Sequence, residues 1–98
     1  MAKQFELFRL GDGTLVVVLQ ADLLSDLRTR VVAPLLPEET TPTMRGLTVP
    51  IEVEGRAYLI LPQLMATLTL AELGTRVGSA AHLRDRLVDA LDLTFTGI

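Results

Sequence analysis

The N-terminal part of the chain has a pattern of apolar and polar positions that predicts a β-hairpin. Residues 4–10 alternate along an extended strand, and the Gly-Asp-Gly run at residues 11–13 then favours a tight turn. The apolar run at residues 15–19 is β-branched at its centre, which is typical of a strand covered on both faces. We therefore expect residues 15–19 to pair back onto residues 4–10.

The middle of the chain predicts a third strand and a second hairpin. Residues 30–35 regain strand character, but Pro34 has no backbone N–H to donate. We therefore expect this strand to lie at a sheet edge or to end at Pro34. Residues 47–53 alternate, the Glu-Gly pair at residues 54–55 is typical of a hairpin turn, and residues 56–61 run back.

The remaining segments predict a loop, one more strand and a C-terminal helix. Residues 37–43 are rich in Pro and polar side chains, which favours a mobile loop, and residues 64–70 alternate as a further strand. Ser79 is a suitable cap for a helix that runs to near the C-terminus. The apolar positions of this helix recur at intervals of four residues: Leu83, Leu87, Leu91 and Phe95. The whole pattern predicts a single, mainly β domain over residues 1–98, with one terminal helix.

The composition supports a folded domain with an aliphatic core. Hydrophobic residues make up 49% of the 98-residue chain and charged residues 21%, so enough apolar surface can be buried to offset the loss of chain entropy. Aromatic residues are only 4% and Trp is absent, so the core must consist mainly of Leu, Val, Ile and Ala. The mean hydropathy of +0.41 indicates apolar surface left uncovered in a monomer, and we expect a homodimer.

The charge and the residue inventory exclude several classes of function. A formal net charge of −3 disfavours a surface for DNA or RNA, because phosphate contacts need clustered Lys and Arg. Cys is absent and His82 is the single histidine, so we expect no metal site and no catalytic triad. The sequence shows no signal peptide and no apolar run long enough to cross a membrane. We therefore expect a soluble, cytoplasmic protein that carries no cofactor.

Several segments resemble the CcdB family of small bacterial toxins, in the same order and at similar spacing over nearly the full chain. Residues 18–24 are similar to a family strand that ends in Gln-x-Asp and two branched apolar residues, and residues 30–35 to its Arg-x-x-x-Pro-Leu strand. The second predicted hairpin, the helix led by His82, and the final Phe-Thr-Gly-Ile, where family members typically have Phe-Trp-Gly-Ile, complete the match.

The resemblance implies an SH3-like β-barrel with a C-terminal helix, of the kind shared with the MazF ribonuclease toxins, assembled as a homodimer. CcdB proteins are not enzymes: they bind the A subunit of DNA gyrase while it holds cleaved DNA, and a small CcdA-like antitoxin neutralises them. Carried over position by position, the gyrase-binding set lies at the end of the helix, with two leucines as a supporting apolar patch. These residues are Asp92, Phe95, Thr96, Gly97 and Ile98, with Leu23 and Leu24.

Two positions of this set depart from the family pattern. Thr96 stands where the family has a Trp that stacks on an arginine of gyrase, and Trp at the centre of an interface is typically worth roughly 2 to 4 kcal/mol on truncation. Asp92 stands where the family commonly has Asn. The sequence therefore indicates either a homologue that no longer poisons gyrase or one that engages a different gyrase or target.

Other interpretations stay open at this stage. Leu23 and Leu24 could be partly buried structural residues, Gly97 and Ile98 could be a frayed chain end, and Asp92 could be a solvated helix residue. A non-toxic homologue could keep the dimer and the antitoxin site. A MazF-like endoribonuclease would need a basic groove beside a general acid or base. The arginines available for such a groove are Arg9, Arg28, Arg30, Arg45 and Arg56.

Overall fold

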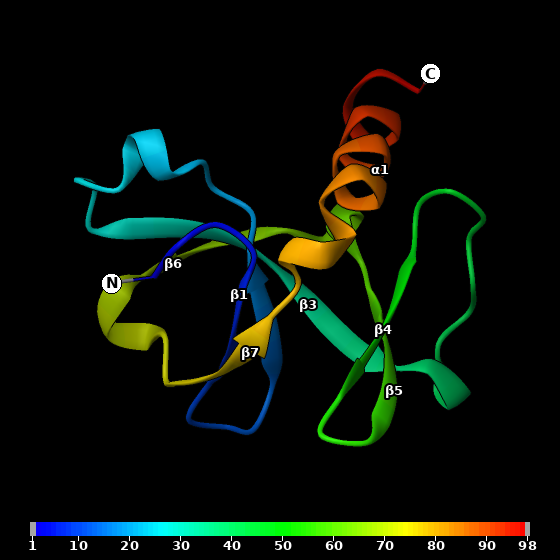
Figure 1. Cartoon of the computed structure of the whole chain (residues 1–98), viewed down its shortest axis with the longest axis horizontal. Coiled ribbons are helices and arrows are strands. Elements are labelled where there is room, and N and C mark those ends of the chain that lie inside the picture. The colour runs from blue at the N-terminus through cyan, green and yellow to red at the C-terminus, as the bar shows by residue number, and fades with distance from the viewer. Residues whose placement is uncertain (1, 98) are drawn as a thin grey trace.

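In the computed structural model, which describes residues 2–97, one antiparallel sheet curls around a long central strand and carries an α-helix on one face (Figure 1). The strands are β1 (Glu6–Arg9), β2 (Leu15–Val18), β3 (Thr29–Pro37), β4 (Val49–Val53), β5 (Arg56–Ile60), β6 (Ala66–Thr69) and β7 (Thr75–Ser79), and the helix is α1 (Arg84–Thr96). Short 3-10 helices join them: η1 (Asp22–Leu24), η2 (Glu38–Thr40), η3 (Pro62–Leu64), η4 (Leu70–Glu72) and η5 (Ala81–Leu83).

Both predicted hairpins are present. In the first, β1 pairs with β2 so that Phe8 lies opposite Val16. In the second, Glu54 and Gly55 form the two-residue loop between β4 and β5, and their φ angles of 52° and 81° are those of the turn that fits the twist of a hairpin. The predicted strand near residues 64–70 is also present as β6, which pairs with β3.

The expectation for Pro34 is wrong, because β3 runs through this residue at the centre of the sheet. One edge of β3 pairs with β2, and the other pairs with β5 near its C-terminal end and with β6 near its N-terminal end. The segment that joins β5 to β6 forms η3 and interrupts the pairing along this edge of β3. Just before η3, the N–H of Leu61 donates a hydrogen bond of 3.0 Å to the carbonyl of Pro34. The nitrogen and the carbonyl of one strand residue point to the same side, so the nitrogen of Pro34 faces the gap between β5 and β6. No strand partner there requires an N–H from it.

The sheet has a core on each face, as the continuous apolar run of β2 predicts. Leu15 and Val17 belong to the larger core, which is closed by Leu87 and Ala90 of α1. Val16 and Val18 point to the smaller core on the other face, where Phe8 and Val32 join them under partly buried leucines near η4. Because both faces of β2 are buried, the helix rests on a rigid support.

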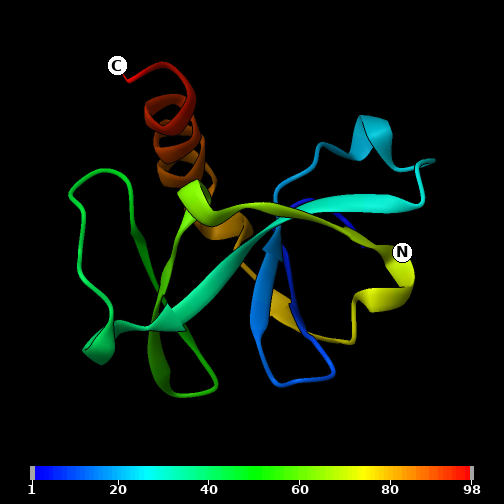
Figure 2. The same cartoon turned by 180° about the vertical axis from the view of Figure 1, so that it is seen from behind.

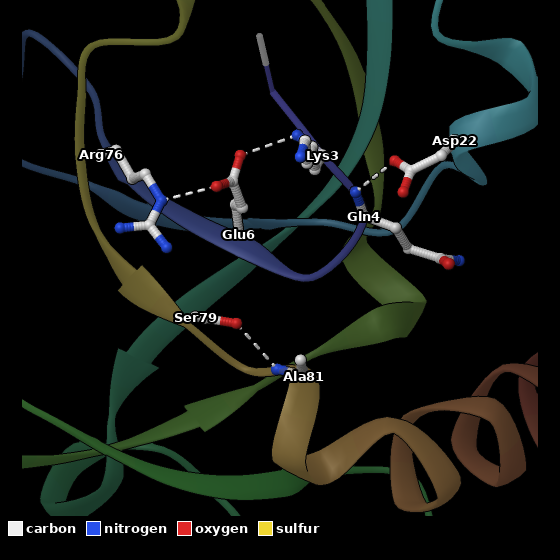
Figure 3. A network of polar contacts seen from close by, with 7 residues as sticks. All are labelled: Lys3, Gln4, Glu6, Asp22, Arg76, Ser79 and Ala81. Carbon is white, nitrogen blue, oxygen red and sulfur yellow. Dashed lines mark hydrogen bonds and ion pairs between the residues drawn. The ribbon is translucent and has the colours of Figure 1, made fainter.

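Strand β7 was not predicted, and the helix begins later than expected. Because β7 is an edge strand with mostly exposed residues, it has no clear alternation of apolar positions. Just before β7, Gly74 passes so close to β1 that a Cβ atom would lie 2.0 Å from the carbonyl oxygen of Arg9, which only glycine permits. The hydroxyl of Ser79 accepts a bond of 3.1 Å from the N–H of Ala81 (Figure 3), so Ser79 caps the entry into η5, and α1 starts at Arg84.

Arg30 is a buried cation that holds the N-terminal half of the fold together. Its side chain lies in β3 and is 1% exposed, and no carboxylate among residues 2–97 pairs with it. The guanidinium instead donates to four backbone carbonyls: Nε to Ala2 at 3.0 Å, Nη1 to Leu27 at 2.7 Å and Thr29 at 2.8 Å, and Nη2 to Ser25 at 3.0 Å. The N-terminal segment and the loop that follows η1 are therefore both tied to β3 by one side chain.

A second polar network joins the N-terminal turn to β7 and η1 (Figure 3). One carboxylate oxygen of Glu6 accepts from the backbone N–H of Lys3 at 2.8 Å, and the other accepts from Nε of Arg76 in β7 at 2.6 Å. The backbone N–H of Gln4 donates to Asp22 at 2.8 Å. Partial burial raises the pKa of Glu6, but the bonds from Lys3 and Arg76 outweigh it and hold this pKa below its ordinary value.

The Glu6 network predicts a specific loss of stability in acid. Because the folded-state pKa of Glu6 lies below its unfolded value, its contribution is complete above the ordinary glutamate pKa and is lost as the pH falls through the folded value. Glu6→Gln should therefore lower the free energy of unfolding at neutral pH by up to about 1 kcal/mol and by less in acid. Urea unfolding at a series of pH values measures this, with the exposed Asp85→Asn as control; an unchanged pH profile in Glu6→Gln would contradict it.

Candidate partner-binding site at the end of the helix

Helix α1 presents its last turn to solvent from a firmly anchored base. Leu87 and Ala90 are fully buried against the sheet, and the N–H of Ala80, just before the helix, donates to the carbonyl of Phe5 at 2.7 Å. Beyond this base the helix projects away from the sheet, and its last turn stands clear of the strands (Figure 1). The end of the helix is therefore both accessible and held in a fixed orientation.

Four of the predicted site residues lie together at this end and are exposed: Asp92, Phe95, Thr96 and Gly97. Phe95 is 71% exposed, so its expected place in the apolar stripe that faces the core is wrong. The buried stripe instead turns through Leu87 and Ala90, with Leu91 partly buried beside them. Ile98 lies outside the described residues.

The last turn is closed by hydrogen bonds within the helix. Gly97 adopts the left-handed conformation with φ of 72°, and its N–H donates to the carbonyl of Leu93 at 3.0 Å, which is a common way for a helix to end. The hydroxyl of Thr96 donates to the carbonyl of Asp92 at 2.6 Å. Because this hydroxyl already has a partner, Thr96 offers a binding protein little more than a small apolar group.

The charge at this end of the helix is negative. Asp92 lies four residues before the end of α1, and the last turn contains no basic residue. This carboxylate therefore adds to the negative end of the helix dipole instead of offsetting it. An exposed aromatic ring near a carboxylate is suited to a partner that carries a cationic side chain.

Leu23 and Leu24 lie on η1, which projects from the same edge of the molecule as the end of α1 but stands well apart from it (Figures 1 and 2). They are 92% and 48% exposed, so the alternative that both are partly buried structural residues is wrong for Leu23. The segment that carries them is well held, because Gln20 donates to the carbonyl of Leu24 at 3.2 Å and Arg30 to that of Ser25. One chain therefore offers two separate surfaces, not one continuous site.

Further exposed apolar residues near the helix were not predicted. Met44 and Leu64 are each about half exposed, and the side chain of Gln63, next to Leu64 in the sequence, lies 3.8 Å from the sulfur of Met44. The loop that carries Met44 also approaches the helix, where the position of a Cβ on Gly46 would lie 3.5 Å from Leu93. Met44 lies in a loop without periodicity, and Leu64 lies in η3 and not at the start of the strand predicted at residues 64–70, so the pattern indicates neither exposed side chain.

The arginines considered for a nuclease groove are dispersed or occupied. Arg30 is buried and bonded to carbonyls, Arg9 forms an ion pair with Glu54, and the guanidinium of Arg56 lies 6.0 Å from the centre of the Tyr58 ring. Arg28 follows η1, and Arg45 lies in the loop before β4. Arg9 and Arg56 both lie near Tyr58, but Arg9 is paired with Glu54, and Arg28, Arg30 and Arg45 lie on other segments.

Two further features of the described chain bear on function. Within residues 2–97, no group of three or more acidic or histidine side chains is placed to hold a metal ion. In the same part of the chain, no helix is long and apolar enough to cross a lipid bilayer.

Solved structures share this fold at low sequence identity. An endoribonuclease from mycobacterial species is 15% identical with a TM-score of 0.79, over 94% of this chain and 88% of that one. An endoribonuclease in complex with its cognate antitoxin, also mycobacterial, is 14% identical with a TM-score of 0.81, over 96% and 94%. The Mycobacterium tuberculosis toxin MazF-mt6 is 19% identical with a TM-score of 0.75, over 95% and 96%. The expected fold, common to CcdB and MazF toxins, is confirmed.

The sequence itself matches the family model described as CcdB protein over residues 4–97, which is nearly the whole chain. No curated protein matches it.

Proposed function

The chain belongs to the CcdB family, and from this premise we propose that it is the toxin of a toxin–antitoxin system that binds the DNA gyrase A subunit and traps the gyrase–DNA cleavage complex. The observation that carries the proposal is the exposed end of α1, where Phe95 projects from a rigid, well-anchored helix. Such an end can enter a partner without rearrangement, so little conformational entropy is lost on binding.

The proposed mode of action is binding, not catalysis. Asp92, Phe95, Thr96, Gly97 and Ile98 would contact gyrase and hold it on cleaved DNA. The dispersion of the arginines supports a binding role, because phosphodiester cleavage needs cationic and acid–base groups that converge on one phosphate.

We further propose that the protein acts in the cytoplasm as a homodimer and that a small CcdA-like antitoxin neutralises it. The exposed apolar residues Met44, Leu64 and Phe95 support a second copy or another protein near the helix, because they leave apolar surface in contact with water. A structure of the same fold bound to its cognate antitoxin supports an antitoxin partner. Leu23 and Leu24 would add a second apolar contact, supplied by either copy of a dimer.

Induction of the chain in cells with a sensitive gyrase tests this function. We expect growth arrest together with DNA breaks that need gyrase, and retention of the gyrase A subunit on the immobilised protein. The matched variant Phe95→Ala removes the exposed ring at the proposed contact and should weaken both effects. Arrest without gyrase-linked DNA breaks, and with cleavage of cellular RNA, would instead establish the endoribonuclease function of the structural neighbours.

A second candidate is a homologue that keeps the fold and the antitoxin site but no longer poisons gyrase. Thr96 favours it, because its hydroxyl is bonded within the helix and its side chain cannot stack. An antitoxin complex that forms without any growth arrest would establish this alternative.

A further inference from the structure

A shallow groove runs along the β4–β5 hairpin, on a surface that the proposed gyrase contact does not use. It consists of three adjoining hollows of about 360, 280 and 270 Å³. The first and second share Arg56, and the second and third share Glu38 and Ala57. We call this surface the hairpin groove.

The floor of the hairpin groove is largely apolar. Leu36, Pro37 and Tyr58 are partly exposed in the first hollow, and Ala57 and Pro50 are exposed in the third. The third hollow also follows β4, which is an edge strand of the sheet. A row of adjoining hollows along a hairpin fits an extended polypeptide, whose alternate side chains can enter the hollows.

The charge of the groove selects the kind of polypeptide. Four carboxylates line it, those of Asp12, Glu38, Glu39 and Glu52, against the single cation of Arg56. The remaining eight acidic and eight basic residues of the chain cancel, so the groove carries the whole formal charge of −3. Asp12 accepts a bond of 2.9 Å from the N–H of Thr14, and this bond lowers the pKa of Asp12 and keeps it ionised.

We propose that the hairpin groove binds an extended, basic polypeptide segment of a protein partner. Lys or Arg side chains of the segment would pair with Glu38, Glu39 and Glu52, and small apolar side chains between them would cover Ala57, Pro50 and Tyr58. The negative potential would also draw such a segment to the groove and repel nucleic acid. This goes beyond the proposed toxin function and involves none of its residues.

Binding of a fluorescent octapeptide of alternating lysine and alanine to the full chain tests the proposal at low salt, where surface charges are least screened. The groove variant Glu38→Gln, Glu39→Gln, Glu52→Gln should weaken the Kd roughly tenfold, because each exposed pair contributes a few-fold. The control variant Asp26→Asn, Asp85→Asn, Asp89→Asn removes the same charge elsewhere and should change the Kd by less than about twofold.

Three results would overturn the proposal: no binding of the peptide to the wild-type chain, equal weakening in the two triple variants, or tighter binding of a single-stranded oligouridylate than of the peptide. Backbone amide shifts confined to Ala57, Tyr58 and their neighbours on addition of the peptide would support it. Because gyrase takes no part in this assay, its outcome is independent of the proposed toxin function.

Discussion

Thr96→Trp should strengthen binding of the protein to the gyrase A subunit by roughly 30-fold to almost 1,000-fold. The estimate takes a buried interfacial Trp as worth roughly 2 to 4 kcal/mol, at about 1.4 kcal/mol for each tenfold change in Kd. Residue 96 is exposed on the last turn of a helix fixed at its base, so the ring would not disturb the core. It would add the stacking surface that the bonded hydroxyl of Thr96 does not supply.

Growth on induction at matched expression, and Kd values for gyrase A, measure this effect. Thr96→Val is the matched control, because it keeps the size of Thr and removes only the hydroxyl that bonds to Asp92. Arrest by Thr96→Trp alone would identify the wild-type chain as a disarmed toxin, and arrest by all forms would show that no aromatic residue is needed at this position. If none of the folded forms binds gyrase, the gyrase assignment must be abandoned.

Arg30→Met should lower the free energy of unfolding by about 3 to 5 kcal/mol, because four hydrogen bonds from a charged donor, each worth roughly 1.5 to 3 kcal/mol, are lost, and part of this loss is offset because no charge is then buried. Methionine can fill much of the same space but donates no hydrogen bond. The carbonyls of Ala2, Leu27, Thr29 and Ser25 would each lose a bond from the guanidinium. Since domains are typically stable by only about 5 to 15 kcal/mol, the N-terminal half would be close to unfolding.

Urea unfolding followed by circular dichroism measures the loss at Arg30. Arg28→Met is the matched control, because it removes the same group from an exposed position and should change the free energy of unfolding by less than about 0.5 kcal/mol. Equal effects of the two substitutions would contradict the prediction. They would show that the four hydrogen bonds of Arg30 stabilise the fold no more than the bonds to water that the same groups make in the unfolded chain.

The elements that the sequence predicts correctly are those set by local chemistry. Glu54 and Gly55 specify their hairpin turn without help from the rest of the chain, and the run at residues 15–19 shows by its composition that both faces are covered. The position of Pro34 depends instead on η3, a segment far along the chain that interrupts the ladder opposite it. No local pattern carries that information.

The residues of the candidate site can be named from the sequence only because the chain resembles the CcdB family. Periodicity placed Phe95 in the apolar stripe, but the helix extends past the sheet before it reaches this residue, so nothing covers the ring. The sequence leaves Arg30 among the arginines available for a basic groove, because it does not show that four carbonyls converge on this side chain. The hairpin groove likewise depends on bringing η2 beside β5, which the sequence pattern does not indicate.

The pairing of β1 with β7 has a consequence for the exposed end of α1. Glu6 lies opposite Ser79, so the sheet is complete only when β1 has paired with β7, which lies about 70 residues further along the chain. Pairings so distant in sequence form slowly and late. The base of α1 docks on a sheet that cannot close before β7 has paired with β1. The orientation of the exposed helix end therefore depends on a pairing made far from it, and a change that weakens the β1–β7 pairing would loosen this end without touching it.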